Sequence, residues 1–165
     1  MIMDHITSAL IHASRTGDLP LLQEIIELNT KLEVRDDKGY TPLIIACYNH
    51  QIEAARLLLQ SGADVNGTDA GGNTALMGVC FKGYVDIAEL LIAHQADLNL
   101  LNGNGGTALM FAAMFGRNEL INLLLQHSAD LEIKDNRGMS ALDIAVQQGN
   151  EIGLQLLKKH LPINQ

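Results

Sequence analysis

The sequence predicts an all-α solenoid in which five helix-turn-helix units stack side by side, joined by β-turn loops. The first observation behind this prediction is composition: 47% of the 165 residues are apolar, only 4% are aromatic, and Trp is absent. Such a core must be built from Leu, Ile, Ala, Val and Met, which favours close-packed helices. The second observation is an internal period of 33 residues, and the third is a pair of helical apolar stripes within each period.

Each unit opens with a short turn. The turn starts with Asp or Asn and has a glycine three positions later, at Asp36 and Gly39, Asp69 and Gly72, Asn102 and Gly105, and Asp135 and Gly138. Glycine suits a turn because a positive φ costs it nothing. We therefore divide the single domain, residues 1–165, into units of about 1–35, 36–68, 69–101, 102–134 and 135–165.

The first helix of each unit, helix A, is expected to start after a hydroxyl residue that accepts a hydrogen bond from an unpaired backbone N–H. Thr41, Thr74, Thr107 and Ser140 hold this position, and Ser8 lies one period before Thr41. Pro42 fits the first helical position of the second unit. We expect helix A to end near Gly17, Gly83, Gly116 and Gly149, with Asn49 and His50 at that place in the second unit.

Apolar residues between these limits recur with the helical period. In helix A a Leu precedes a small residue by three positions, as at Leu10 and Ala13, Leu43 and Ala46, Leu76 and Val79, Leu109 and Ala112, and Leu142 and Ala145. The second helix, helix B, follows the glycine and carries apolar runs at 57–59, 90–92 and 123–125. Helices this short are marginal alone, so the stacking of neighbouring units must bury and stabilise them.

The second unit reads DDKGYTPLIIACYNHQIEAARLLLQSGADVN, which closely resembles the ankyrin repeat, with its turn, TPL helix start and GADVN ending. The third and fourth units keep TAL and the AD ending, but Gln95 and Ser128 replace the glycine of that ending. The family's histidine after TPL is absent, and Ile44, Met77, Met110 and Asp143 stand there. The first unit lacks TPL and is the expected N-terminal cap. The fifth ends helix B with Gln155, Lys158, Lys159 and His160, which is typical of a solvent-facing cap.

Charge and hydropathy argue against several classes of partner and location. A net charge of −8 and a pI near 5.0 disfavour nucleic acid and anionic membrane. No segment approaches the roughly 18 apolar residues of a membrane span. Asp4 and His5 interrupt the place where a secretory signal would need a basic start and an apolar run. Two Cys make no disulfide framework, so we expect a cytoplasmic, reducing compartment.

Recurring His and Cys residues could suggest chemistry, but their spacing argues otherwise. His94, His127 and His160 recur with the repeat. Neighbouring helices pack about 8–10 Å apart, whereas each ligand of one zinc ion must reach to about 2.0 Å. We expect these imidazoles to interact with exposed carbonyls at the end of helix B. Cys47 and Cys80 are expected to be free, buried thiols, because a disulfide requires Cα atoms within about 7 Å.

Two other patterns also have structural explanations. The glycine-rich run 102–106 precedes a helix, but it lacks the Lys of a phosphate-binding loop and follows no predicted strand. Asp64, Asp97 and Asp130 recur in one copied environment, whereas an acid-base pair needs two different environments. Turn hydrogen bonding explains them. We therefore predict no catalytic residue, cofactor or metal site, and no enzymatic activity.

The resemblance implies that a partner protein contacts the tips of the inter-unit turns and the exposed, concave face of helix A. The candidate partner-binding residues at these positions are Lys38, Tyr40, Tyr48, Asn49, Asn73, Phe81, Lys82, Asn104, Met114, Phe115, Arg137 and Met139. Large apolar residues on a surface often mark an interface. Our hypothesis is a stripe of Tyr48, Phe81, Met114 and Phe115, with Lys38, Lys82 and Arg137 at its rim. In the alternative, Phe81 or Phe115 covers the junction of helices A and B.

The sequence therefore predicts a monomeric, non-enzymatic module that binds another protein. Alternatives are a regulatory or protective accessory subunit of an enzyme, a self-associating scaffold, and an enzyme on the same scaffold. The last would need a concave pocket with convergent polar groups. The partner's identity is not readable, because specificity in repeat scaffolds lies in surface residues without a transferable motif.

Overall fold

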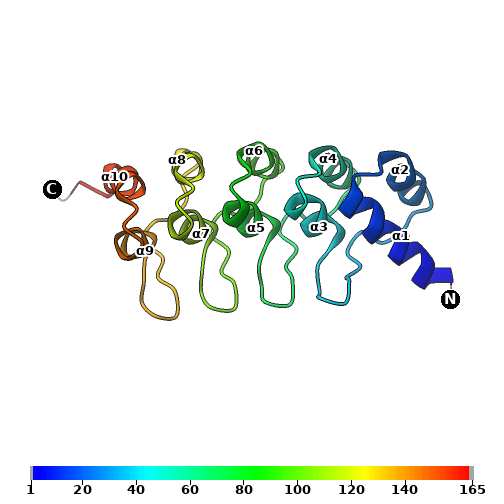
Figure 1. Cartoon of the computed structure of the whole chain (residues 1–165), viewed down its shortest axis with the longest axis horizontal. Helices are drawn as coiled ribbons and strands as arrows, with labels where there is room; N and C mark the ends of the chain where they lie inside the picture. The colour runs from blue at the N-terminus through cyan, green and yellow to red at the C-terminus, as the bar shows by residue number, and fades with distance from the viewer. Residues whose placement is uncertain (1, 164–165) are drawn as a thin grey trace.

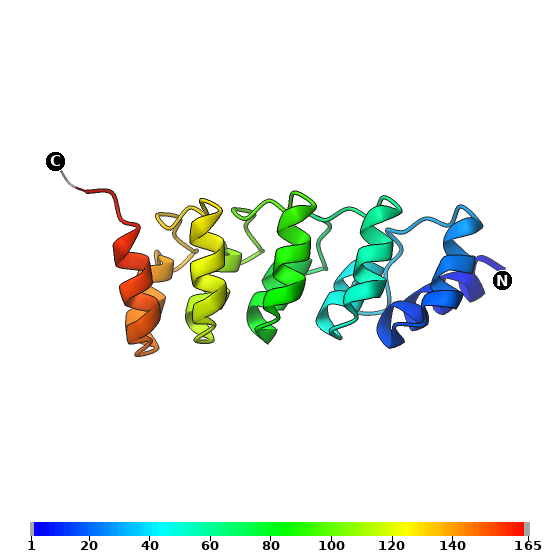
Figure 2. The same cartoon turned by 90° about the horizontal axis from the view of Figure 1, so that it is seen from above.

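A computed structural model describes residues 2–163, which form five pairs of α-helices arranged in two rows (Figure 1). Helix A of the successive units is α1 (Ile2–Thr16), α3 (Pro42–Tyr48), α5 (Ala75–Lys82), α7 (Ala108–Met114) and α9 (Ala141–Gln147). Helix B is α2 (Leu19–Glu27), α4 (Ile52–Gln60), α6 (Val85–Ala93), α8 (Asn118–Gln126) and α10 (Glu151–Lys159). The helix B row lies side by side when seen from above (Figure 2). The predicted all-α repeat solenoid is confirmed.

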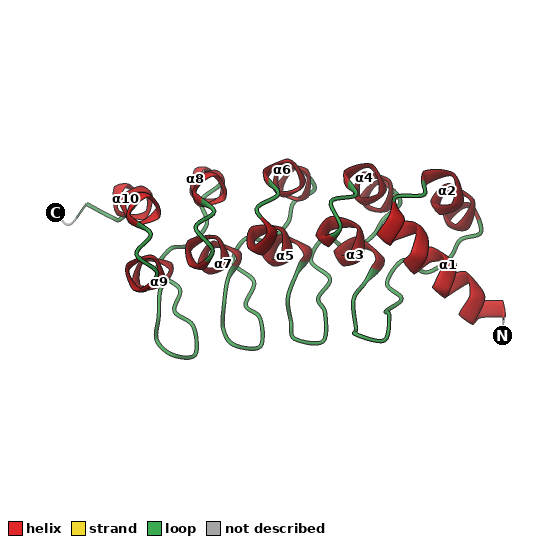
Figure 3. Ribbon diagram, viewed as in Figure 1, coloured by secondary structure: helices red, strands yellow, loops and turns green. Residues whose placement is uncertain are grey.

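Long loops project from the helix A row, on the side away from helix B (Figure 3). Between residues 2 and 163 they contain no strand, only the isolated bridges Thr68 to Thr74 and Lys134 to Ser140. We call the tips of these loops, residues 36–40, 69–73, 102–106 and 135–139, the fingers. We use the term concave face for the surface that helix A and the fingers make together, following the corresponding surface of the resembled family.

The predicted helix starts are confirmed in units two to five. Each hydroxyl oxygen accepts a hydrogen bond from the backbone N–H three residues on, at 3.2–3.3 Å, in Thr41, Thr74, Thr107 and Ser140. Ser140 also donates its backbone N–H and its hydroxyl to Asp143, both at 2.9 Å, which completes a capping box. These bonds hold the pKa of Asp143 below its ordinary value. They also explain an acid at the position where the resembled family has histidine.

The first unit departs from the prediction that Ser8 starts its helix A. Helix α1 runs from Ile2 to Thr16, so Ser8 lies inside it and caps nothing. The segment before Ser8 has no glycine turn, and nothing there stops the helix from extending toward the N-terminus. The helix lies diagonally across the end of the stack, where it packs against α2 and α3 (Figure 1).

The predicted ends of helix A are confirmed. Gly17, Gly83, Gly116 and Gly149 all have positive φ, between 65° and 88°. In the second unit His50 takes the same left-handed conformation, at a φ of 57°. A single left-handed residue ends the hydrogen-bonding ladder and turns the chain toward helix B.

One continuous core runs along the stack between the two helical rows. The recurring leucines Leu10, Leu43, Leu76 and Leu109 of helix A are at most 2% exposed, and Leu58, Leu91 and Leu124 of helix B are fully buried. At the C-terminal end, Lys158, Lys159 and His160 are exposed, as expected of a cap. Val146 there is 57% exposed, while its counterparts Cys47, Cys80 and Ala113 are fully buried. Stacking of the next unit is what buries that position.

Candidate functional site: the concave face

The shape of each finger is set by the side chain of its first residue. Asp69 Oδ1 accepts hydrogen bonds from the backbone N–H of Gly71 and of Asn73, both at 2.8 Å. Asn102 Oδ1 does the same for Asn104 and Gly106, at 3.0 and 2.8 Å. Asp36 and Asp135 make the corresponding pairs of bonds in their own fingers. An Asp or Asn is needed here because its short acceptor reaches its own backbone two and four residues on.

Neighbouring fingers are also hydrogen-bonded to one another. The N–H of Gly103 donates to the carbonyl of Gly71 at 2.9 Å, and the N–H of Asn136 donates to the carbonyl of Asn104 at 3.0 Å. A Cβ on Gly72, whose φ is +80°, would lie 3.0 Å from the backbone nitrogen of Gly103. Glycine in this finger therefore permits both the turn and the close approach of the next finger. The three C-terminal fingers form a connected row.

An aromatic row crosses the concave face from α3 to α7. The ring centroids of Tyr48 and Phe81 are 6.1 Å apart and their planes differ by 4°, while Phe81 meets Phe115 edge to face at 4.7 Å. Phe111 lies beside Phe115 with the centroids 6.5 Å apart. Tyr48 is 42% exposed and Phe115 39%, so the row keeps apolar surface in contact with water. Such packed but accessible aromatics are typical of interface centres.

Lys82 contributes charge within this row rather than outside it. Its ammonium nitrogen lies 4.8 Å from the ring centroid of Tyr48 and 5.8 Å from that of Tyr84. These are cation–π distances, and they link the second and third units. The placement differs from the rim position that we expected, because the aromatic faces attract the ammonium group inward.

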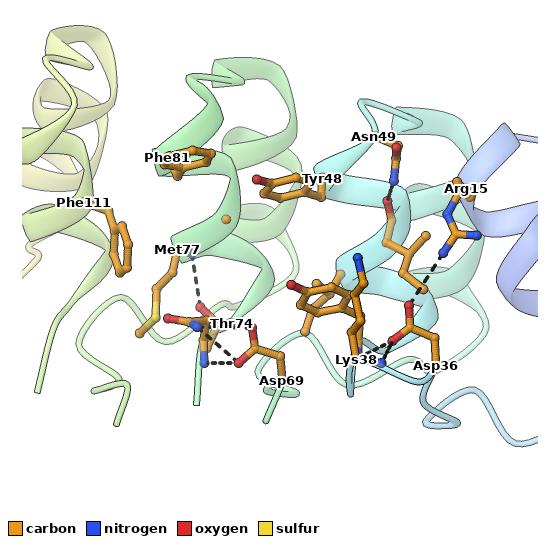
Figure 4. A pocket seen from close by; sticks show the side chains of 15 residues that line it. Arg15, Asp36, Lys38, Tyr48, Asn49, Asp69, Thr74, Met77, Phe81 and Phe111 are labelled. Carbon is orange, nitrogen blue, oxygen red and sulfur yellow. Dashed lines mark hydrogen bonds and ion pairs between the residues drawn. The ribbon is translucent and has the colours of Figure 1, made fainter. Parts of the chain in front are cut away.

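The larger cavity of the concave face, here called the first groove, lies between α3 and α5 and has a volume of about 580 Å³. Figure 4 shows its aromatic wall of Tyr48, Phe81 and Phe111 above the finger carboxylates Asp36 and Asp69. Arg15 reaches in from α1 and lies 3.6 Å from Asp36. The groove thus combines apolar walls with charged groups at the finger side.

A second groove, of about 470 Å³, lies between α7 and α9. Met110, Phe111, Met114 and Ile144 supply its apolar lining, and Asn104, Asp135 and Arg137 lie at its finger side. Arg137 holds Asp135 with Nη2 2.9 Å from Oδ2. The backbone N–H of Met139, together with Arg137, holds the pKa of Asp135 below its ordinary value. Phe111 lines both grooves and separates them.

Most of the predicted partner-binding residues line these two grooves. Those at the first groove are Lys38, Tyr40, Tyr48, Asn49, Asn73 and Phe81, and those at the second are Asn104, Met114 and Arg137. Phe115 joins the aromatic row, and Lys82 lies over Tyr48. Met139 is half-buried against the core and donates its N–H to Asp135 at 3.0 Å.

Both the nitrogen and the oxygen of the Asn73 side-chain amide are hydrogen-bonded within the protein. Its Nδ2 donates to both oxygens of Asp69 at 3.2 Å, and its Oδ1 accepts from Asn102 Nδ2 at 2.9 Å. Asn49 likewise donates to the carbonyl of Ile45 at 2.8 Å. These two amides are oriented by the fold before any partner arrives.

Several groove residues were missed by the sequence reasoning, among them Arg15, Asp69 and two residues of one repeat register, Phe111 and Gly78. Phe111 lies in the middle of α7 and between the two grooves, and Gly78 lies in the middle of α5 and lines the first groove. A signal for both was present in the repeat: residues 45, 78, 111 and 144 share one register, occupied by Ile45, Gly78, Phe111 and Ile144. A comparison of these four residues would have shown that the third unit has a glycine where the other units have a large apolar side chain.

The alternative chemistries have structural explanations here. No group of three potential metal ligands occurs within residues 2–163. The Nδ1 atoms of His94 and His160 lie 3.0 Å from the carbonyl oxygens of Leu90 and Leu156, which confirms their interaction with helix ends. Cys47 and Cys80 are free and buried, as predicted. Burial raises the pKa of the Cys47 thiol to about 12 and raises that of Cys80 as well.

The glycine-rich finger offers no backbone donors to a phosphate. The N–H groups of Gly103, Asn104, Gly105 and Gly106 all donate to Gly71 or Asn102. The recurring acids Asp64, Asp97 and Asp130 each accept a hydrogen bond at 2.9 Å from the backbone two residues on. Both findings agree with the turn explanation. No helix in the described part of the chain is long and apolar enough to cross a bilayer.

Comparison with known proteins places this geometry in context. A family model described as ankyrin repeats (3 copies) matches residues 10–102 and, again, residues 76–165. Over 62 residues the chain is 34% identical to the human protein phosphatase 1 regulatory subunit 27. That match covers 38% of this chain and 40% of the relative, so the two proteins correspond over less than half their lengths.

Proposed function

The chain belongs to the ankyrin repeat family, and on that premise we propose that it is a non-enzymatic module that binds another protein through its fingers and the concave face of helix A. The single observation that carries this proposal is the aromatic row. Tyr48, Phe81 and Phe115 come from three successive units, Phe81 packs between the other two, and Tyr48 and Phe115 expose apolar surface. Interface centres are enriched in such aromatics.

The net charge of −8 bears on the class of partner. An acidic protein attracts a basic surface over several ångströms, and salt screens that attraction. We expect a protein partner with a basic contact surface, and an association rate that falls as ionic strength rises. Nucleic acid and membrane are not proposed as partners.

The test is a calorimetric titration of the partner, isolated by affinity capture, into the double variant Phe81→Ala/Phe115→Ala. Affinity should fall by more than about 2 kcal/mol, which is roughly 30-fold in Kd, because both rings lie in the proposed contact centre. The matched control is Ile152→Ala, an exposed apolar residue of α10 away from the concave face, 64% exposed. Unchanged affinity in a double variant with native helicity would remove the aromatic row from the interface.

A second candidate is a regulatory or protective accessory subunit of an enzyme. The partial likeness to a human protein named as a phosphatase 1 regulatory subunit favours this candidate. Its test is whether an enzyme co-purifies with the chain from the native host and changes in activity or lifetime when the purified chain is added. An enzyme with unchanged rate and half-life would argue against it.

Oligomeric state and location complete the proposal. We propose a monomer in the cytoplasm, where a reducing environment suits the two free thiols. Light scattering at several concentrations should give 17.9 kDa throughout. A mass that rises with concentration would favour the self-associating scaffold instead, and recovery of the chain in another cell fraction would contradict the location.

A further inference from the structure

Gly78 interrupts the apolar lining of the concave face. It lies in the interior of α5, at the register where the other units carry Ile45, Phe111 and Ile144. Ile45 is 3% exposed and Ile144 1%, so this register normally holds a large side chain that fills the space between helix A and the fingers. A glycine at such a place weakens the helix relative to alanine, because it has more backbone freedom to lose on folding.

The backbone itself supplies no reason for a glycine at this position. The glycines with positive φ are those of the turns and helix ends, and Gly78 is not among them. A Cβ added to Gly78 would meet only Tyr48 Cδ2, at 3.5 Å, which is an ordinary van der Waals contact. Gly72 differs, since a Cβ there would press on the next finger. The fold accepts a Cβ at residue 78, so close packing does not require glycine there, and the missing side chain leaves the space above it open.

That space is part of the first groove. Its walls next to Gly78 are apolar: Tyr48 from α3, Met77 and Phe81 from α5, and Phe111 from α7. Small-ligand pockets measure about 300–1,000 Å³, so a groove of about 580 Å³ can take one large side chain with the backbone that carries it. In the second groove, of about 470 Å³, the same register carries the buried side chain of Ile144.

The finger beside Gly78 carries a carboxylate without a cation. In the other fingers that begin with Asp, the carboxylate has a partner: Asp36 lies 3.6 Å from Arg15, and Asp135 lies 2.9 Å from Arg137. Gly71 stands at the register of Arg137, and no Lys or Arg of the described chain forms an ion pair with Asp69. Asp69 Oδ2 accepts one hydrogen bond, from Asn73.

We propose that the first groove is a socket for a peptide segment that places one large aliphatic or aromatic side chain over Gly78 and, beside it, a Lys or Arg that pairs with Asp69. This inference rests on the proposed function and names the chemistry of the partner that the concave face takes. Charge complementarity selects this occupant: Asp69 forms no ion pair with any described Lys or Arg, and the net charge of the chain is −8.

The direct test uses short peptides and the full 15N-labelled chain, followed by NMR. The probes are acetylated and amidated peptides with one Leu and one Lys separated by zero, one or two glycines. In matched peptides Gly replaces Leu, or Glu replaces Lys. At least one Leu/Lys peptide should cause saturable shifts at the amides of Gly78 and Gly71, with a Kd at least fivefold lower than both of its matched peptides. Absence of saturable shifts at Gly78 with the whole series overturns the proposal.

Three variants separate the two halves of the socket. Gly78→Ile restores the side chain found at residues 45 and 144 and should weaken the best peptide at least tenfold, with Gly78→Ala intermediate. Asp69→Asn should abolish the preference for Lys over Glu while keeping the finger, since Asn102 makes the same two backbone bonds. Asp135→Asn, in the second groove, is the control and should leave peptide binding unchanged. Equal peptide affinity in native chain and Gly78→Ile overturns the proposal even if all variants fold.

The captured partner distinguishes failure of the socket from failure of the concave face. If the partner is lost from Phe81→Ala/Phe115→Ala but binds Gly78→Ile with native affinity, the face is the interface and the socket is wrong. If the partner binds both variants with native affinity, the proposed function itself is wrong. The expected result is at least a tenfold weaker complex with Gly78→Ile, whose helicity and melting temperature match or exceed those of the native chain.

Discussion

The first and second grooves share one backbone plan and differ in what fills it. At the register between helix A and the fingers, the first has Gly78 and the second has Ile144. In the first groove Asp69 forms no ion pair within residues 2–163, whereas Asp36 lies near Arg15 and Asp135 of the second groove is held by Arg137. The repeat therefore determines where side chains stand, and single residues decide how large the apolar lining of a groove is and whether its finger carboxylate is paired with a cation.

Position along the stack helps to explain why the hollow lies where it does. Helix α5 packs against α3 on one side and α7 on the other, whereas α9 has only α7 beside it in its row. In a solenoid each unit is stabilised by its interfaces with its neighbours, so an inner unit has more interface to offset a weak helix. The last unit instead has Ile144, the Ser140 capping box and the Asp135 to Arg137 pair.

The largest expected effect on stability comes from Ile144→Gly, which would make the second groove resemble the first. We expect a loss of about 3–5 kcal/mol in the free energy of unfolding, because a buried side chain is removed and a glycine enters a helix interior. Denaturant titration followed by circular dichroism measures it, with Ile144→Val as the mild control at about 1 kcal/mol. A loss below about 1 kcal/mol for the glycine variant would show that the end unit does not depend on this register.

A second test compares inner and end units by the reactivity of a thiol at equivalent positions of helix A, residues 47, 80 and 146. The thiols of Cys47 and Cys80 are fully buried, and burial raises the pKa of Cys47 to about 12. They should stay unreactive toward a thiol reagent at pH 8 until the protein unfolds. Val146→Cys, at the exposed equivalent position, should react faster by on the order of 1,000-fold, because a pKa three units lower gives that much more thiolate. Equal rates would mean that the inner units open readily.

A smaller effect is expected when a single methyl group is added at residue 78 of the first groove. Gly78→Ala should raise the free energy of unfolding by about 0.5–1 kcal/mol, since alanine has the higher helix propensity and its Cβ meets only Tyr48. Thermal and denaturant unfolding both report the change. Gly116→Ala is the control and should destabilise, because that residue has a φ of 66°. A destabilised Gly78→Ala variant would mean that the groove floor has no room for a methyl group.

The smallest expected effect concerns acid stability of the second groove. Hydrogen bonds and Arg137 lower the pKa of Asp135 in the folded state. The stability that this contributes is fully present above the unfolded-state pKa and is lost as pH falls through the lower folded-state pKa. The melting temperatures of native chain and Asp135→Asn should therefore differ near pH 6 and converge below about pH 4. Arg137→Ala should close part of that difference, and a constant difference across the range would contradict the assignment.

Much of the helical framework could be predicted from the repeat alone. The hydroxyl caps of units two to five, the left-handed ends of helix A and most of the recurring leucines stand where local chemistry predicts them, while Leu142 of the last unit is only half-buried. The prediction that Ser8 starts a helix was wrong because the repeat period alone does not make a helix cap. A capping residue also needs a turn before it, and the first unit has none. Lys82 was expected at a rim and instead lies over the rings of Tyr48 and Tyr84, and the contact with Tyr48 depends on the neighbouring unit.

The sequence by itself determined the number of units, their period, and the positions that face the core or the solvent, because each depends on interactions within a few residues. Only the tertiary structure decided that Gly78 lines a groove, that Phe111 lies between two grooves, and that Asp69 forms no ion pair in the described part of the chain. The physical reason is distance along the chain: these features arise where side chains from units 33 residues apart meet across the stack. No local propensity specifies how such side chains share that space.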